Sequence, residues 1–257
     1  MFRPIWGVDM RTLNRGISMT ETLLVVEGLQ SGYGDIQVLW GIDLVVQEGE
    51  IVCLVGSNGV GKTTLLRSIS GLLNLRAGRL LMQGSEITGL GPDKVLQSGI
   101  AHVPEGRRLF RTMSVVDNLL MGAYMRTKEE SEIRIDLERV MQMFPRLAER
   151  RHQDAGTLSG GEQQMCAIGR GIMSRPKLLM IDELSLGLAP KAVETLSESL
   201  RDIRSSGVSI LLVEQDVMTA FELADRGYVI DQGRVSMSGP SQELLKAPEI
   251  REAYLGM

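Results

Sequence analysis

The sequence has few of the residues that build disulfide frameworks or metal centres. It contains only two cysteines, Cys53 and Cys166, and two histidines, His102 and His152. We interpret both cysteines as small buried hydrophobes, which is typical of proteins in a reducing cytoplasm. Neither histidine has a cysteine or carboxylate partner at ligand spacing, so the sequence predicts no zinc site.

Long apolar runs and an excess of basic residues are also missing. The longest apolar runs, such as residues 51–55 and 210–213, have the length of strands. They fall well short of the ~18 residues that a membrane-spanning helix needs, so the chain is not expected to cross a bilayer by itself. The formal net charge of -4 gives no reason to expect a nucleic-acid surface.

The first twenty residues lack the continuous apolar region of a signal peptide. Periodic structure begins only at Leu23, so we predict that residues 1–21 form a flexible extension, unless translation starts at Met10 or Met19. The intact mass of the natively expressed protein distinguishes these cases, because a mass matching all 257 residues rules out the later starts.

A predicted strand, a glycine-rich turn and a predicted helix follow one another from residue 51. The spacing Gly56-x4-Gly61-Lys62-Thr63 is that of a P-loop, whose glycines let backbone N–H groups approach phosphate oxygens. Lys62 can reach the β- and γ-phosphates, and the Thr63 hydroxyl is placed to bind Mg2+. The stretch predicts a nucleoside triphosphate site without separating GTPase, kinase and ATPase.

A second helix start carries an unusual pair of glycines. Ser159 and Glu162 have the spacing of a capping box, and a helix is predicted from there to about residue 173. Gly160 and Gly161 in its first turn cost stability unless something approaches the backbone closely. We therefore predict that this helix start receives an anion.

Two carboxylates follow a predicted buried strand at residues 177–181. Asp182 stands where a P-loop fold needs a carboxylate to hold Mg2+ through water, opposite Thr63. Glu183, the next residue, can polarise a water for attack on the γ-phosphate.

The remaining apolar runs complete an α/β pattern around these motifs. We predict further strands at residues 23–26, 39–46, 78–84, 100–103 and 209–213, a closing hairpin at 228–230 and 234–237, and helices at 61–73, from Pro92, and at 242–257.

A mostly helical stretch at residues 118–147 has an apolar, methionine-rich face. The face comprises Met113, Leu119, Leu120, Met121, Met125, Val140, Met141, Met143 and Phe144. Two interpretations stay open: the core of a helical subdomain, or a groove that receives a partner, since methionine adapts its shape.

Taken together and in this order, the three motifs resemble those of the ATPase subunit of ABC transporters. The third is residues 178–183, reading Leu-Leu-Met-Ile-Asp-Glu, and the second extends over residues 158–164, reading Leu-Ser-Gly-Gly-Glu-Gln-Gln. The resemblance covers residues 22–240. It implies an α/β P-loop NTPase with a RecA-like core, an antiparallel β subdomain and an α-helical subdomain inserted at about 106–165, followed by a C-terminal helical tail at 241–257.

Four shorter stretches, at residues 103–110, 185–190, 213–215 and 224–228, resemble the LivF-like ATPases of branched-chain amino-acid importers. Such systems pair this subunit with a second ATPase, two membrane permeases and a periplasmic binding protein. The resemblance thus implies a homo- or heterodimeric, peripheral protein at the cytoplasmic face of the inner membrane, with no nucleic-acid partner.

The resemblance also assigns roles to single residues, since in this family two subunits sandwich two ATP molecules head to tail. Glu183 would be the general base, with Lys62 and Gln215 as further catalytic residues. Thr63, Asp182 and Glu105 would serve Mg2+. The expected ATP-binding residues are Tyr33, stacked on the adenine, then Gly56, Ser57, Asn58, Gly59, Val60, Gly61, Lys62, Thr63 and Thr64, and from the other subunit Ser159, Gly160, Gly161 and Glu162.

Four positions depart from the general pattern of the family. Glu105 replaces a glutamine, Leu184 a proline, Ala189 an aspartate and Gln215 the switch histidine. Gln215 can donate an amide hydrogen bond to the γ-phosphate but cannot titrate. Because Glu183 is intact, we predict a working, slow ATPase.

Two other classes of protein are weighed against this one. Non-transport cassettes generally carry tandem cassettes, long coiled coils or basic arms, and a switch GTPase carries an Asn-Lys-x-Asp stretch; the sequence has none of these. No residue here is expected to touch the cargo, so urea, short amides and other amino acids stay open as alternatives to branched-chain amino acids.

Overall fold

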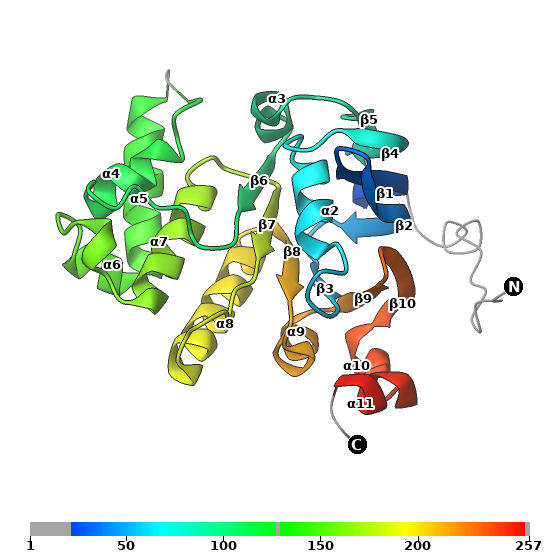
Figure 1. Cartoon of the computed structure of the whole chain (residues 1–257). Helices are drawn as coiled ribbons and strands as arrows, with labels where there is room; N and C mark the ends of the chain where they lie inside the picture. The colour runs from blue at the N-terminus through cyan, green and yellow to red at the C-terminus, as the bar shows by residue number, and fades with distance from the viewer. Residues whose placement is uncertain (1–21, 127–128, 255–257) are drawn as a thin grey trace, which may run out of the picture.

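The computed structural model describes residues 22–126 and 129–254. The predicted extension at 1–21 lies outside the described residues. Within them, a parallel sheet occupies the centre, a helical lobe lies on one side and a smaller antiparallel sheet on the other (Figure 1).

The central sheet has six strands in the order β10-β9-β3-β8-β7-β6. The strands are β3 (Ile51–Val55), β6 (Ile100–Val103), β7 (Leu178–Asp182), β8 (Ser209–Glu214), β9 (Arg226–Asp231) and β10 (Arg234–Pro240). All neighbours pair in parallel except β9 and β10, which form the predicted closing hairpin. Strands β3, β7 and β8 are buried along their whole length, as expected for parallel strands covered on both faces.

The antiparallel sheet has the order β2-β1-β4-β5. It consists of β1 (Thr22–Tyr33), β2 (Ile36–Gln47), β4 (Leu75–Met82) and β5 (Ser85–Glu86). Strands β1 and β2 are much longer than predicted, because pairing continues through register shifts around Gly28, where the apolar alternation breaks. Gly28 has φ 56°, and its N–H donates to Asp43 Oδ1 at 2.7 Å.

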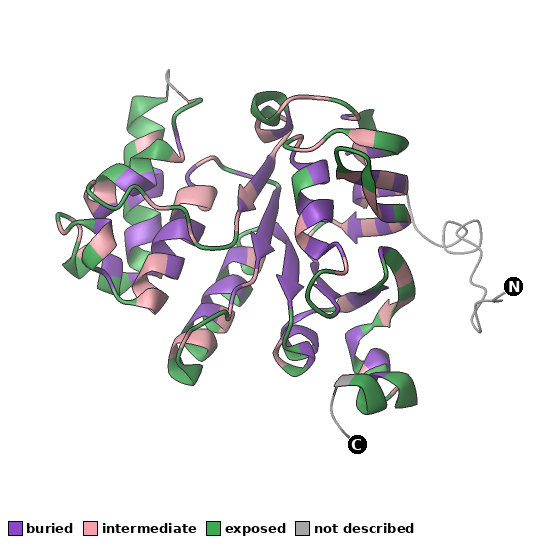
Figure 2. Cartoon of the chain, viewed as in Figure 1, coloured by how far each residue is buried: buried purple, intermediate pink, exposed green. Residues whose placement is uncertain are grey.

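Alternate residues of the central strands belong to two separate hydrophobic cores. Ile51, Cys53 and Val55 of β3 belong to one core, on the side where β3 contacts helix α9 (Val217–Leu223). Val52 and Leu54 pack on the other side, against the antiparallel sheet and helix α2 (Lys62–Ile69). Strands β7 and β8 are accordingly coloured as buried in Figure 2.

The helical lobe is built from α4 (Val115–Met121), α5 (Glu130–Met143), α6 (Pro145–Glu149) and α7 (Gly160–Ile172). The predicted helical stretch is therefore interrupted, since α5 ends before Pro145. Ser114 caps α4, its side chain accepting from the Asp117 N–H. The core interpretation of the methionine-rich face is confirmed for Leu119, Val140, Met141 and Phe144, which are buried, but not for Leu120, Met121 and Met125, which are exposed.

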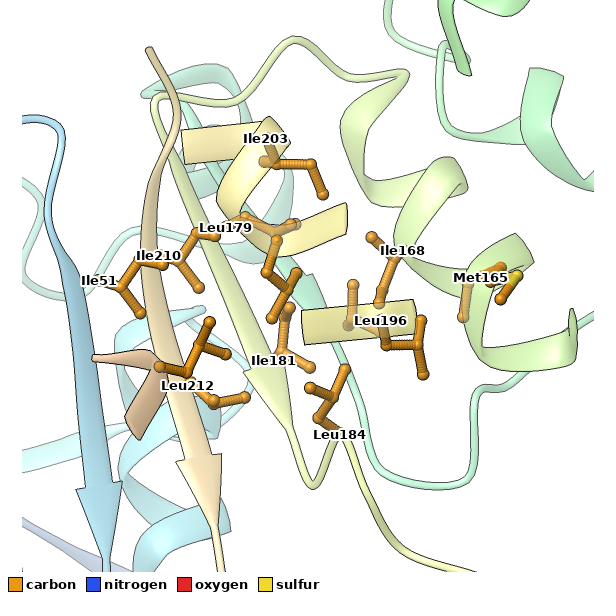
Figure 3. Packing of buried hydrophobic residues seen from close by; sticks show 14 of the residues in the cluster. Ile51, Met165, Ile168, Leu179, Ile181, Leu184, Leu196, Ile203, Ile210 and Leu212 are labelled. Carbon is orange, nitrogen blue, oxygen red and sulfur yellow. The ribbon is translucent and has the colours of Figure 1, made fainter. Parts of the chain in front are cut away.

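Further helices lie between the strands or follow the last of them. They are α3 (Pro92–Gln97), α8 (Pro190–Ser205), α9 (Val217–Leu223), α10 (Ser241–Leu244), α11 (Pro248–Tyr254) and the short 3-10 turn η1 (Ala155–Thr157). The prediction included α3 and a helical C-terminal segment but missed α8 and α9. Leu196, Leu200 and Ile203 of α8 pack in the same core as β7 and β8, as Figure 3 shows for Leu196 and Ile203.

His102 on β6 gives the fold a pH dependence of its own. Its Nδ1 lies 3.1 Å from Ser70 Oγ, and burial, helped by the Arg67 charge, lowers the pKa of the imidazole to about 4. Because the unfolded chain takes up this proton near pH 6.5, stability is lost as pH falls from there towards 4. We expect the free energy of unfolding to drop by about 2 kcal/mol between pH 7 and 4.5 from this residue.

Urea titrations of the wild type and of His102→Gln at the two pH values measure this contribution. In His102→Gln, the free energy of unfolding should fall less between the two pH values, because the variant lacks the contribution of His102. An equal loss in both proteins would show that His102 is not the group responsible.

Candidate functional site

The predicted P-loop connects β3 to α2 and forms one wall of a cleft. Gly61 has φ 112°, and a Cβ there would lie 2.6 Å from Leu39 Cδ2, so this position excludes a side chain. The cleft has a volume of about 330 Å3. It is lined by Asn58, Gly59, Gly61, Lys62, Thr63, Thr64, Glu105, Glu183, Leu186 and Gln215.

Lys62, the first residue of α2, supplies the positive charge of the loop. Its Nζ donates to the carbonyl oxygens of Gly56 at 2.6 Å and Ser57 at 3.1 Å. Burial lowers the pKa of the ammonium, while the charges of Glu183 and Asp182 oppose that shift. A buried cation beside backbone N–H groups at a helix N-terminus suits a phosphate group.

Asp182 at the end of β7 faces the start of α2. The Thr63 hydroxyl donates to its Oδ1 at 3.2 Å, whereas its Oδ2 is buried and has no hydrogen-bond partner in the described part of the chain. Burial raises the pKa of this carboxyl to about 6; the Thr63 bond opposes the shift, and the charges of Glu183 and Glu105 add to it. An unsatisfied carboxylate oxygen beside a hydroxyl fits a hard cation such as Mg2+.

Among the described residues, no group of three or more His, Cys, Asp or Glu side chains could hold a metal by itself. Mg2+ is usually bound by one or two carboxylates together with substrate phosphates and water, and the neighbouring Thr63 hydroxyl and Asp182 carboxylate can supply the protein's share of such ligands. The residues present therefore fit the predicted ion.

Glu183 projects into the same cleft from a strained turn. Its backbone has φ 56°, in the left-handed region that few non-glycine residues adopt, and its N–H donates to Val213 O at 3.0 Å. Such strain persists only where the surroundings hold it, and it is common at functional sites. Gln215, just beyond β8, lines the cleft beside Glu183.

Tyr33 lies beside the P-loop helix, at the end of β1. Its hydroxyl is 3.5 Å from Thr64 Oγ1 and accepts from Arg67 Nη1 at 3.3 Å. The side chain is 43% exposed and is not among the residues that line the cleft. Its position next to Thr64 agrees with base stacking, which stays a prediction.

The predicted anion-receiving turn at the start of α7 does not reach this cleft. The capping box is confirmed, with Ser159 N donating to Glu162 Oε2 at 2.8 Å and Glu162 N donating to Ser159 Oγ at 3.4 Å. The Glu162 carboxylate also pairs with Arg150 at 2.8 Å. One chain thus does not bring its two predicted ATP-binding segments together.

Three residues near the cleft were not predicted: Leu186, Arg107 and Glu214. Leu186 lines the cleft. The Arg107 guanidinium donates one hydrogen bond to the Leu186 carbonyl oxygen at 3.4 Å and another to Gln164 Oε1 on α7 at 3.3 Å. Arg107 and Leu186 lie in stretches that carry the LivF-like resemblance but were given no role of their own, whereas Glu214 directly follows a predicted strand, as Asp182 does.

Leu184, the departure that follows Glu183, is fully buried. It packs with Ile181 and Leu196 in the core beneath the cleft (Figure 3). We expect Leu184→Ala to lower the free energy of unfolding by about 2–4 kcal/mol, because it removes buried methyl groups from a filled core. Denaturant unfolding measures this, with the exposed Leu72→Ala as control; equal stability of the two variants would contradict the packing role.

A parallel sheet with a P-loop after β3, carboxylates at the ends of neighbouring strands and a helical lobe define an ATP-binding cassette. Residues 39–185 match the ABC transporter family model. The chain therefore belongs to the ABC transporter family, as its ATPase component.

Individual proteins agree with this assignment. The chain is 44% identical to the high-affinity branched-chain amino acid transport ATP-binding protein BraG of Pseudomonas aeruginosa, over 91% of this chain and 100% of that protein. It is 36% identical to the probable branched-chain amino acid transport ATP-binding protein LivF of Archaeoglobus fulgidus, over 89% of this chain and 97% of that protein. The crystal structure of the ADP conformation of an ATP-binding cassette of an ABC transporter superposes on this chain with a TM-score of 0.79 at 25% identity. The match covers 93% of this chain and 100% of that one.

These findings confirm the predicted family, its LivF-like character and the α/β P-loop fold. No helix of the described residues is long and apolar enough to cross a membrane. The domain boundaries and the roles of single site residues stay predictions.

Proposed function

We propose that this chain is the ATP-hydrolysing subunit of an importer for branched-chain or related amino acids. The observation that carries this proposal is the match to BraG over its whole length, combined with a P-loop cleft that holds both Asp182 and Glu183. The alternatives are an importer of amides, urea or other amino acids, and a non-transport cassette ATPase.

In the proposed mechanism, the triphosphate of ATP lies along the P-loop, with Lys62 against its β- and γ-phosphates. Thr63, Asp182 and Glu105 would hold Mg2+, which would supply positive charge against the phosphates. Glu183 takes the proton of the attacking water, and Gln215 donates a hydrogen bond to the γ-phosphate.

A second ATPase subunit completes each site in this proposal. Gly160 and Gly161 offer backbone N–H groups, and Ser159 its hydroxyl, at the start of a helix of 13 residues; none of the three lines the P-loop cleft of its own chain. We infer that this turn contacts the γ-phosphate bound by the partner subunit. ATP binding then closes the dimer, and hydrolysis reopens it.

A set of exposed apolar side chains on α4 and in the segments on either side of it, here called the apolar patch, supports docking to two membrane permeases. The patch consists of Phe110, Leu120, Met121, Tyr124 and Met125, all exposed. Buried Asn118 fixes its loop, since its side chain accepts from Phe110 N at 2.9 Å and donates to Phe110 O at 3.0 Å. The chain would then lie peripherally at the cytoplasmic face of the inner membrane, engage a periplasmic binding protein only through the permeases and bind no nucleic acid.

Tyr124→Asp tests this patch, because a charge placed in an apolar contact must lose its water. We expect co-purification with the permeases to fall about tenfold or more. Ile36→Asp is the matched control, since Ile36 is equally exposed at 71% but lies on β2. Equal recovery of permeases by both variants would contradict docking through the patch.

Transport itself is tested in proteoliposomes that hold the assembled importer and its binding protein. ATP should drive leucine uptake, GTP should not, and Glu183→Gln should stop it. Uptake of urea or a short amide in place of leucine would favour the alternative cargo. ATP hydrolysis without any association with permeases would favour a non-transport cassette.

A further inference from the structure

A second buried carboxylate lies behind the cleft, at the end of β8. Glu214 is 1% exposed. Its Oε1 accepts from the Ser185 N–H at 2.8 Å, and its Oε2 accepts from Ser185 Oγ at 2.9 Å and from the Gln215 N–H at 3.2 Å. Both oxygens of one side chain are thus committed to the two loops that bear Glu183 and Gln215.

These bonds complete a two-point attachment of the strained turn. The Glu183 N–H donates to Val213 O, and two residues later Ser185 is held by Glu214. Residues 183–185 are therefore fastened to residues 213–214 at both ends. The left-handed backbone conformation of Glu183 needs such constraint, because a strained conformation persists only while its surroundings hold it.

We propose that Glu214 is a positioning residue, which holds the Glu183 side chain and the Gln215 loop in one fixed arrangement for hydrolysis. The proposal rests on the proposed role of Glu183 as general base. It concerns geometry rather than contact with ATP, since Glu214 itself does not line the P-loop cleft.

The hydrogen bonds between Ser185 and Glu214 make glutamine an informative replacement for Glu214. Ser185 presents an N–H and an O–H, and a carboxylate offers an acceptor to each. In Glu214→Gln one of the two terminal atoms becomes an NH2 donor, so one bond is lost or reversed while the volume stays the same. The turn should then remain folded but lose its fixed placement.

A matched control is available at the opposite end of the neighbouring strand, β3. Glu50 precedes β3, is 7% exposed, and accepts from the Gln47 N–H at 2.7 Å and from Arg226 at 3.1 Å. Burial raises the pKa of Glu50 and of Glu214 alike. A purely structural carboxylate would therefore behave as Glu50 does.

The test compares kcat and the ATP dissociation constant of the full chain assembled with its permeases. We expect Glu214→Gln to lower kcat about tenfold with ATP affinity changed less than about twofold. Glu50→Gln should leave kcat within about twofold, even where it lowers the thermal midpoint. In a Glu183→Gln background, adding Glu214→Gln should change the residual rate less than about twofold, because the group to be positioned is already absent.

A wild-type kcat in Glu214→Gln would overturn the proposal. So would a result in which Glu214→Gln lowers kcat by the same factor in the wild type and in the Glu183→Gln background. Should Glu214→Gln fail to fold, Ser185→Ala replaces it, with an expected fall of about threefold and an unchanged kcat as the overturning result. An unchanged rate in Glu183→Gln alone would instead refute the proposed general base, so the two failures are distinguishable.

Discussion

Replacing Glu183 with glutamine is expected to lower ATP hydrolysis by about 10²- to 10⁴-fold, while ATP still binds. The substitution keeps the size of the side chain in the cleft and removes only its ability to accept the proton of the attacking water. Because Lys62 and the P-loop are untouched, the variant should trap ATP rather than lose it.

Turnover and ATP binding measured on the same preparation test this expectation. Glu222→Gln, an exposed carboxylate on α9, is the control and should keep the wild-type rate. A wild-type rate in Glu183→Gln would mean that another group, or water alone, takes the proton.

The second large effect is expected from Lys62→Ala, which should weaken ATP binding by about 10- to 100-fold. The ammonium is buried among backbone carbonyls and provides charge-assisted hydrogen bonds that water cannot replace within the loop. Thermal stabilisation by ATP, present in the wild type, should then be largely lost at the same ATP concentration.

Lys191→Ala on α8 controls for loss of positive charge, because Lys191 is exposed. It should show the wild-type thermal shift with ATP. If Lys62→Ala shows that shift as well, the ammonium does not contact the triphosphate.

The predictable part of this molecule is the part whose signals are local. The P-loop needs only a strand, a glycine turn and a lysine in sequence, and the capping box at Ser159 needs only four residues; the P-loop connection and the cap are both present as predicted. Buried strands such as β7 were recognisable because a fully apolar run has few other uses in an α/β chain.

What escaped prediction depends on contacts between distant segments. Strand β1 continues past Gly28 because its neighbours hold it there, which no local pattern reveals. Arg107 and Glu214 acquire partners 79 and 29 residues away, at Leu186 and Ser185. Helix α8 is a different case, since Pro190 and its buried residues at helical spacing were visible in the sequence.

The most direct test of the whole account is the structure of the Glu183→Gln chain, with its partner ATPase, at saturating ATP. Our account predicts a dimer in which the Ser159 to Gly161 turn of one protomer contacts the γ-phosphate held by the P-loop of the other. A structure in which ATP is bound and that turn faces solvent, away from any second subunit, would contradict it.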